Sequence, residues 1–127
     1  MNGPRVPFDD LLHFRRTLRA PGDVVVEVDV DERYHNPMGI VHGGVLCGLL
    51  DTAMGASVTS TLAAGETCIN MDFHVRFLRP AVRGRLLAEA RWVRRGKGTV
   101  VMEASVHDDA GEEVARASST FLLRPRH

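Results

Sequence analysis

Hydrophobic residues recur at every second position in two stretches of the chain, which predicts strands there. In the first, valines at positions 24, 26, 28 and 30 alternate mostly with acidic residues, as expected for a half-buried strand over 24–31. In the second, apolar residues at odd positions from Ile69 to Phe77 alternate with polar ones. This second pattern predicts one long strand over 67–78.

Shorter patterns predict the remaining elements. Residues 8–14 can form a short helix with Asp9 and Asp10 in its first turn, and residues 15–19 a short strand. Three further strands are expected over 85–95, 99–106 and 113–123. Turn signals occur at 21–23, 96–98 and 108–111. Because tight turns join antiparallel neighbours, the sheet is expected to be antiparallel.

The run from His35 to Ser57 has a different character. Proline and glycine interrupt its first ten positions, and an apolar stretch with the length of a helix follows. Asp51 is the only charged residue between Gly43 and Gly65. Because a helix that is apolar nearly all round is a buried one, we expect Asp51 to lie in a largely dry environment, where a carboxylate is a candidate for function.

These elements predict an α+β domain in which one long helix covers one face of the sheet. A chain of 127 residues is expected to form a single domain over 1–127, with a flexible segment at 1–7. No secretory signal or apolar stretch of membrane-spanning length is present, so we expect a cytoplasmic protein without a membrane partner.

The net charge is zero, but eight of the 16 Lys and Arg residues lie between Arg76 and Lys97. This clustering indicates a local anion site rather than nucleic-acid binding, or else ion pairs on polar strand faces. The two cysteines suggest neither a disulfide framework nor a metal site, and His35 and His42 are poorly spaced as metal ligands. We therefore expect no metal, and no G-x-S-x-G supports a serine hydrolase.

Gly43 and Gly44 suit a helix entry, where backbone N–H groups without partners could polarise a carbonyl oxygen, although a glycine pair can also serve only a tight turn. Asp51 lies eight residues further on, about 12 Å away along one helix, whereas hydrogen-bond reach is about 3 Å. A single carbonyl could contact both groups if two copies of the helix pack antiparallel about a two-fold axis. A structural role for Asp51 is the alternative.

The motif N-P-x-G-x-x-H-G-G over 36–44, followed by Asp51, resembles the hotdog-fold acyl-CoA thioesterases. The phenylacetate-pathway and 4-hydroxybenzoyl-CoA thioesterases are the most similar branch. The resemblance includes 77–80, 95–99 and 108–111, and covers roughly 24–124. It implies a hotdog fold, one long buried helix wrapped by an antiparallel sheet of five to six strands, and a homodimer or homotetramer with active sites at the interface.

The resemblance also implies roles for individual residues. Asp51 is expected to act as base or nucleophile, and the Gly43 N–H of the opposite subunit to polarise the thioester carbonyl. Asn36 would position water or substrate, and His42 would shape the site. Some relatives carry a hydroxyl one turn after the acid, where this chain has Gly55. Asn70 or Asp72 on the facing strand are candidates to replace it in placing water.

Coenzyme A is part of the implied substrate, so no separate cofactor is expected. Its phosphates require basic residues. The residues implied for this contact are Arg79, Lys97, Gly98, Thr99 and Arg126. Residues that could form the acyl pocket are Met54, Val58, Leu62, Phe73 and Phe77. Two other functions stay open: hydration or dehydration of an acyl thioester, and non-catalytic acyl-CoA binding.

Overall fold

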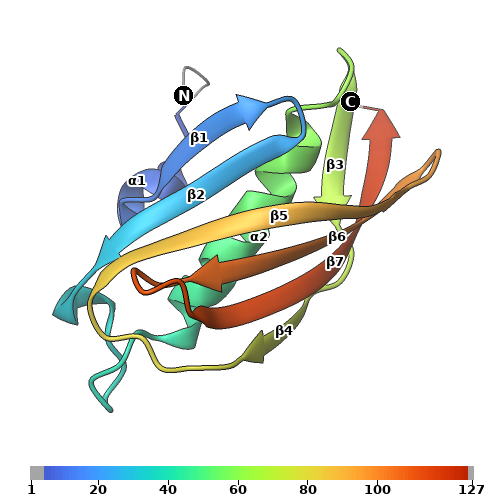
Figure 1. Ribbon diagram of the computed structural model, residues 1–127. Helices are drawn as coiled ribbons and strands as arrows, with labels where there is room; N and C mark the ends of the chain where they lie inside the picture. The colour runs from blue at the N-terminus through green and yellow to red at the C-terminus, as the bar shows by residue number, and fades with distance from the viewer. Residues whose placement is uncertain (1–4, 126–127) are drawn as a thin grey trace.

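The computed structural model describes residues 5–125 and contains one long helix behind a curled antiparallel sheet (Figure 1). The sheet order is β1-β2-β5-β6-β7-β3, and β4 also pairs with β7. The helical elements are α1 (Pro7–Leu12), the short 3-10 helix η1 (Glu32–Tyr34) and α2 (Gly43–Thr59). The strands are β1 (Arg15–Ala20), β2 (Asp23–Val30), β3 (Glu66–Asn70), β4 (His74–Phe77), β5 (Gly84–Arg95), β6 (Thr99–His107) and β7 (Glu113–Pro125). The predicted hotdog fold is confirmed.

The ends of the chain limit two predictions. Residues 1–4 of the segment expected to be flexible lie outside the described residues, and so does Arg126. Pro7 is the first residue of α1, where proline is favoured because its missing N–H is not needed. Within residues 5–125 no helix has the length and apolarity required to cross a membrane.

The predicted long strand over 67–78 is two strands. Residues 71–73 separate β3 from β4, and both strands pair with β7. At the break, three residues face only two on β7, and the Asp72 carboxylate accepts the backbone N–H of Thr120 at 2.7 Å in place of a strand carbonyl. The alternation of apolar and polar residues continues through this bulge, so the pattern does not reveal it. The sheet consequently has seven strands rather than five to six.

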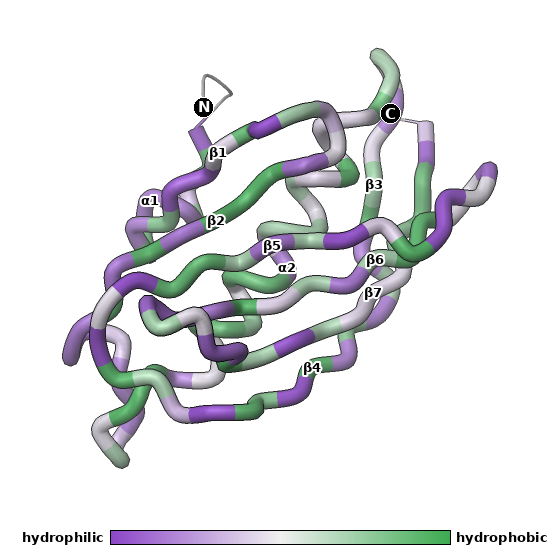
Figure 2. The backbone as a smooth tube through the Cα atoms, viewed as in Figure 1, coloured by the Kyte–Doolittle hydropathy of each residue, from purple (hydrophilic) through white to green (hydrophobic). Residues whose placement is uncertain are grey.

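The core lies between the inner face of α2 and the sheet. Leu49, Leu50, Met54 and Val58 of α2 are fully buried, as are alternate residues of β2, β5 and β6. Figure 2 shows the corresponding hydrophobic stretch along β2 and the alternating hydrophobic and hydrophilic segments of the strands that follow it. In β2, β5 and β6 this alternation buries one side of the strand and leaves most of the charged residues on the other side.

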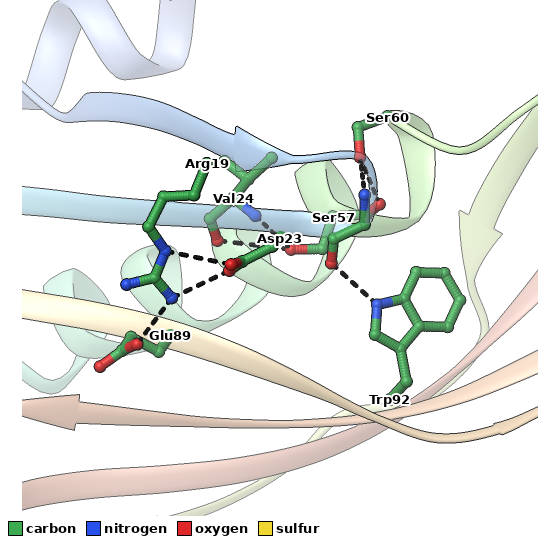
Figure 3. A network of polar contacts seen from close by, with 8 residues as sticks. Arg19, Asp23, Val24, Ser57, Ser60, Glu89 and Trp92 are labelled. Carbon is green, nitrogen blue, oxygen red and sulfur yellow. Dashed lines mark hydrogen bonds and ion pairs between the residues drawn. The ribbon is translucent and has the colours of Figure 1, made fainter.

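The C-terminal end of α2 is fixed to the turn between β1 and β2 (Figure 3). The buried Ser57 hydroxyl accepts the N–H of Val24 at 3.1 Å and lies 3.3 Å from the Val24 carbonyl. Ser60 accepts the N–H of Gly22 at 2.8 Å, and the Trp92 indole N–H donates to the Gly22 carbonyl at 2.8 Å. The two serines thus attach the C-terminal end of α2 to the β1–β2 turn and the start of β2.

Candidate functional site

The side of α2 that faces away from the sheet is a row of small residues around Asp51. Gly44 and Asp51 are exposed, and Cys47, Gly48 and Gly55 are half-buried. The expectation that Asp51 lies in a dry environment is therefore wrong for the single chain. Glycine and cysteine surround Asp51 on this side of the helix, and although the Phe8 ring approaches Gly48 and the Phe121 ring approaches Gly55, Asp51 itself stays exposed.

Asn70 at the end of β3 holds the Asp51 carboxylate. Its Nδ2 donates to Asp51 Oδ1 at 2.7 Å and lies 3.2 Å from the hydroxyl of Ser119, a buried residue. Its Oδ1 accepts the backbone N–H of Asp72 at 3.2 Å. Since the amide contacts the strand on one side and the carboxylate on the other, Asn70 fixes the direction in which Asp51 points. Asn70 thus contacts the acid itself.

Asp51 lines a cleft of about 480 Å³ between α1, α2 and the β3–β4 bulge. The apolar part of its lining comes from Phe8, Cys47, Met71 and Phe73. Burial, together with the nearby negative charge of Asp51, raises the pKa of the Cys47 thiol, so this cysteine is a weaker nucleophile at neutral pH than a free one. An acid beside an apolar wall is an arrangement that can act on a reactive carbonyl while holding its apolar substituent.

A second cleft, of about 370 Å³, lies at the N-terminal end of α2 and is lined by Asn36, Gly43, Phe77 and Arg79, among others. Within the described residues the Gly43 N–H donates to no acceptor. The Asn36 Oδ1 accepts the N–H of Met38 at 2.9 Å, whereas its Nδ2 donates to no described group. Two donors are therefore open at this cleft, beside the positive end of the helix dipole.

The packing around Gly43 explains why glycine stands there. A Cβ at this position would lie 3.1 Å from Cζ of Phe77, so a larger side chain would displace the ring or the start of the helix. Packing against Phe77 therefore favours glycine at position 43, and glycine also allows a ligand to come close to its N–H.

His42 occupies neither cleft. Its Nδ1 accepts the N–H of Gly44 at 2.8 Å and caps α2, and its ring lines a third cleft with His13, Tyr34 and His35. The cap takes up the Gly44 N–H, which leaves the neighbouring Gly43 N–H as the open donor of the first turn. Any influence of His42 on the site passes through the helix end that it caps.

The structure brings Asn36 and Gly43 together but leaves Asp51 in a separate cleft of the same chain. This separation agrees with the eight-residue spacing along one helix. Within residues 5–125, no group of three or more His, Cys, Asp or Glu side chains could hold a metal ion.

The basic residues expected to contact coenzyme A are divided between two ends of the molecule. Arg79 lines the Gly43 cleft and lies 3.3 Å from a carboxylate oxygen of Glu112. Lys97, Gly98 and Thr99 lie at the β5–β6 hairpin, at the opposite end of the sheet in Figure 1. Half of the basic residues between Arg76 and Lys97 form ion pairs. Arg85–Glu27 and Arg91–Glu103 join residues of neighbouring strands, whereas Arg79–Glu112 and Arg83–Glu32 involve loops and η1.

Of the residues considered for the acyl pocket, Met54 and Val58 are fully buried against the sheet and cannot line a cleft. Phe73 lines the Asp51 cleft, and Phe77 the Gly43 cleft. No sequence pattern indicates a role for Phe8, which lines the Asp51 cleft from α1. Its contact depends on how α1 docks on α2, and no local pattern encodes that docking.

Comparison with known proteins gives a consistent result. The thioesterase superfamily model matches residues 38–115. The 1,4-dihydroxy-2-naphthoyl-CoA hydrolase of Listeria monocytogenes is 25% identical over 105 residues, covering 83% of this chain and 85% of the relative. A Bacillus halodurans protein solved with CoA is 29% identical, with a TM-score of 0.88, over 97% of this chain and 82% of that one. The E. coli PaaI protein from the phenylacetic acid degradation operon is 25% identical, with a TM-score of 0.86, over 94% and 85%.

Proposed function

The chain belongs to the thioesterase superfamily and is a thioester hydrolase, and we propose that it cleaves an acyl-CoA to a free acid and coenzyme A in sites shared by two copies. One observation carries the proposal: the oriented Asp51 carboxylate and the open Gly43 N–H line different clefts of one chain. The Listeria relative, named as a CoA hydrolase, and the neighbour solved with CoA support the substrate class.

The proposed chemistry needs a base or nucleophile and one oxyanion donor. Asp51 removes a proton from water as the water oxygen adds to the thioester carbonyl, and the Gly43 N–H of the partner subunit stabilises the resulting oxyanion. Collapse of the intermediate breaks the C–S bond, and the thiolate of coenzyme A leaves. In the alternative route Asp51 itself attacks the carbonyl, the C–S bond breaks and the thiolate of coenzyme A leaves; water then hydrolyses the mixed anhydride to the free acid and the Asp51 carboxylate.

The spacing of the two groups defines where the two-fold axis would lie. If Asp51 of one copy faces Gly43 of the other along antiparallel helices, the axis passes beside the midpoint, which is Cys47. Gly44, close to that point on the outward side, is exposed and has no side chain, so two helices can approach closely there, whereas the Phe8 ring of the same chain lies over Gly48. We infer that the outward side of α2 around Gly44, Cys47 and Asp51 is the contact between two copies of α2.

The same pairing gives roles to Asn36 and His42. The open Nδ2 of Asn36 would donate to water or to the substrate beside the Gly43 N–H. His42, as the cap of α2, would hold the first helical turn in place so that the Gly43 N–H keeps its direction. His42 is thus proposed as a positioning residue.

Antiparallel pairing also accounts for the divided basic residues. The β5–β6 hairpin lies at the C-terminal end of α2, where Arg95 Nη1 donates to Thr61 Oγ1 at 2.9 Å. In the proposed dimer this end of one copy approaches the N-terminal end of the other, which carries Arg79. Arg79 of one subunit and Lys97 of the partner subunit could then bind the phosphates of one coenzyme A molecule.

Two substitutions at Gly43 test the oxyanion donor. Gly43→Pro removes the N–H, and the backbone suits it because Gly43 is the first helical residue and His42 is extended, at φ −60° and ψ 135°. Gly43→Ala keeps the N–H but makes the same close contact with Phe77. We expect Gly43→Pro to lower kcat about 10²–10³-fold relative to Gly43→Ala, measured by thiol release from acyl-CoA. Equal activities of the two variants would refute the role of the N–H.

Mixing inactive variants tests whether the sites are shared. A hybrid of Asp51→Ala and Gly43→Pro subunits contains one complete site, so an exchanged equimolar mixture should recover about a quarter of wild-type turnover. Mass spectrometry of the intact dimers shows whether subunits have exchanged. Exchange without recovery would refute the shared site, and thiol release against enoyl absorbance separates hydrolysis from hydration.

Cross-linking tests the position of the axis. With Cys68 replaced by Ser, a short bismaleimide should join two copies through Cys47, whereas the Cys47→Ser variant should stay unlinked. Because burial and Asp51 raise the pKa of the Cys47 thiol, the linkage should form faster as the pH rises. Absence of linkage at high pH in a dimeric protein would place the axis elsewhere.

A further inference from the structure

The short helix α1 places an aromatic ring over a gap in α2. Gly48 has no side chain, and a Cβ built on it would lie 3.3 Å from ring atoms of Phe8 and 3.5 Å from the ring of Phe14. The two phenylalanine rings meet edge to face, with centroids 5.9 Å apart. Phe8 therefore occupies the space that a larger residue at position 48 would fill.

The position of α1 is fixed by contacts on its other side. The Asp9 carboxylate is 7% exposed and pairs with the guanidinium of Arg16 on β1. The Asp9 carbonyl accepts the N–H of Phe14 at 2.9 Å, and the Leu12 carbonyl accepts the Tyr34 hydroxyl at 2.8 Å. These bonds tie α1 to β1 and η1, so Phe8 is presented by an anchored element.

Phe8 is nevertheless only partly covered by the chain. Phe8 is 46% exposed and lines the Asp51 cleft together with Met71 and Phe73. An anchored aromatic residue with free surface beside the reacting carboxylate gains contact area when an apolar group enters. The acyl group of a thioester at Asp51 is such a group.

Resting on the proposed function, we propose that Phe8 contacts the acyl group and determines acyl selectivity, with Gly48 as the residue that admits it. An acetyl group ends one carbon from the thioester carbonyl and leaves the Phe8 ring uncovered. A ring-bearing acyl group extends along the cleft and covers it. The selectivity for the larger group then depends on the side chain at position 8.

Phe8→Ala tests this assignment, with Leu11→Ala as its matched control. Leu11 lies on the same helix, is 73% exposed and does not line the Asp51 cleft. The measurement is kcat/KM for phenylacetyl-CoA and for acetyl-CoA by thiol release. We expect Phe8→Ala to lower the ratio of the two about tenfold, and Leu11→Ala to leave it within about twofold.

Further outcomes separate this proposal from its alternatives. Phe8→Leu keeps apolar volume over Gly48 without the ring, and its ratio should lie between those of wild type and Phe8→Ala. Equal losses for both substrates, or a raised dimer dissociation constant in Phe8→Ala, would assign the ring to folding or subunit pairing and overturn the proposal. An unchanged ratio would also overturn it. A wild-type protein that releases thiol from neither substrate would instead refute the proposed function.

Discussion

The polar groups at the two ends of α2 differ in whether they have hydrogen-bond partners within the chain. At the C-terminal end, Ser60 and Trp92 bond to the backbone of Gly22 in the β1–β2 turn, and Ser57 bonds to the backbone of Val24 at the start of β2 (Figure 3). In the first turn at the N-terminal end, His42 takes up one N–H, while the N–H of Gly43 stays without an acceptor in the described chain. The same helix thus begins beside open donors and ends in a closed hydrogen-bond network.

This difference separates groups that support the fold from groups that are free to bind. Within residues 5–125 every buried side-chain nitrogen or oxygen has a hydrogen-bond partner. The open groups instead line clefts, where water can satisfy them until a ligand does, so they add little instability. We therefore expect substitutions at the N-terminal half of α2 to affect activity, and those at the C-terminal end to affect stability.

The largest effect is expected from Asp51→Asn. The variant keeps an Oδ1 that can accept the Asn70 amide, so the fold and the orientation should persist, whereas the charge and the basicity are lost. We predict that kcat falls about 10²–10⁴-fold or more, with thermal unfolding unchanged. Thiol-release kinetics and a melting curve at the same protein concentration measure the two quantities.

Asn70→Ala is the companion variant for Asp51. It leaves the carboxylate in place but frees it from the strand, so kcat should fall while KM changes little. Full activity in Asp51→Asn would show that Asp51 takes no part in the reaction. It would also contradict the expectation that substitutions in the N-terminal half of α2 affect activity.

A smaller effect, and one of the opposite kind, is expected from Ser57→Ala. The hydroxyl is fully buried and bonds to both backbone groups of Val24, which would lose this partner. We predict a loss of about 1–3 kcal/mol in unfolding free energy, or about 3–10 °C in Tm. Thermal or denaturant unfolding measures the loss, and kcat at low temperature should stay close to wild type. A large fall in kcat without destabilisation would break the division between the two ends.

Much of the fold was predictable from the chain because its signals are local. The period-two valines of β2, the length of the apolar run in α2 and the glycine turns each depend on neighbouring residues. The break at 71–73 was missed, since it arises from the side chain of Asp72 bonding to β7 rather than from any change in pattern. Non-local hydrogen bonds leave no trace in hydrophobic alternation.

The candidate site was predictable in its residues but not in its surroundings. The spacing of Gly43 and Asp51 already indicated that one chain would not present both groups to a single carbonyl, and in the structure the two residues line different clefts. The exposure of Asp51 was wrongly predicted. The small, mostly apolar residues around it suggested a buried side of the helix, whereas in the single chain Asp51 is exposed. Asn70 was expected only as a candidate to place water, and its bond to Asp51, 19 residues away in sequence, depends on the tertiary packing. The same holds for Phe8, which lines the Asp51 cleft from 43 residues away.

The smallest effect is expected at Gly55, one turn after Asp51 on the outward side of α2. A Cβ there would lie 3.7 Å from the Phe121 ring, which is an ordinary packing distance. Because glycine within a helix is unfavourable, Gly55→Ala should raise the unfolding free energy by about 0.5–1 kcal/mol.

Gly55→Ser adds a hydroxyl to the same backbone, and comparison with Gly55→Ala isolates its effect on the reaction. Since Asn70 already orients the carboxylate at 2.7 Å, a second polar group near Asp51 has little left to correct. We expect kcat of the two variants to agree within about threefold. An increase in kcat of more than about tenfold in Gly55→Ser but not in Gly55→Ala would contradict this. It would mean that the wild-type site orients Asp51 well but positions the attacking water poorly. Asn70 would then orient only the Asp51 carboxylate, and the Gly43 N–H and the Asn36 amide of the partner subunit would not be sufficient to position the water.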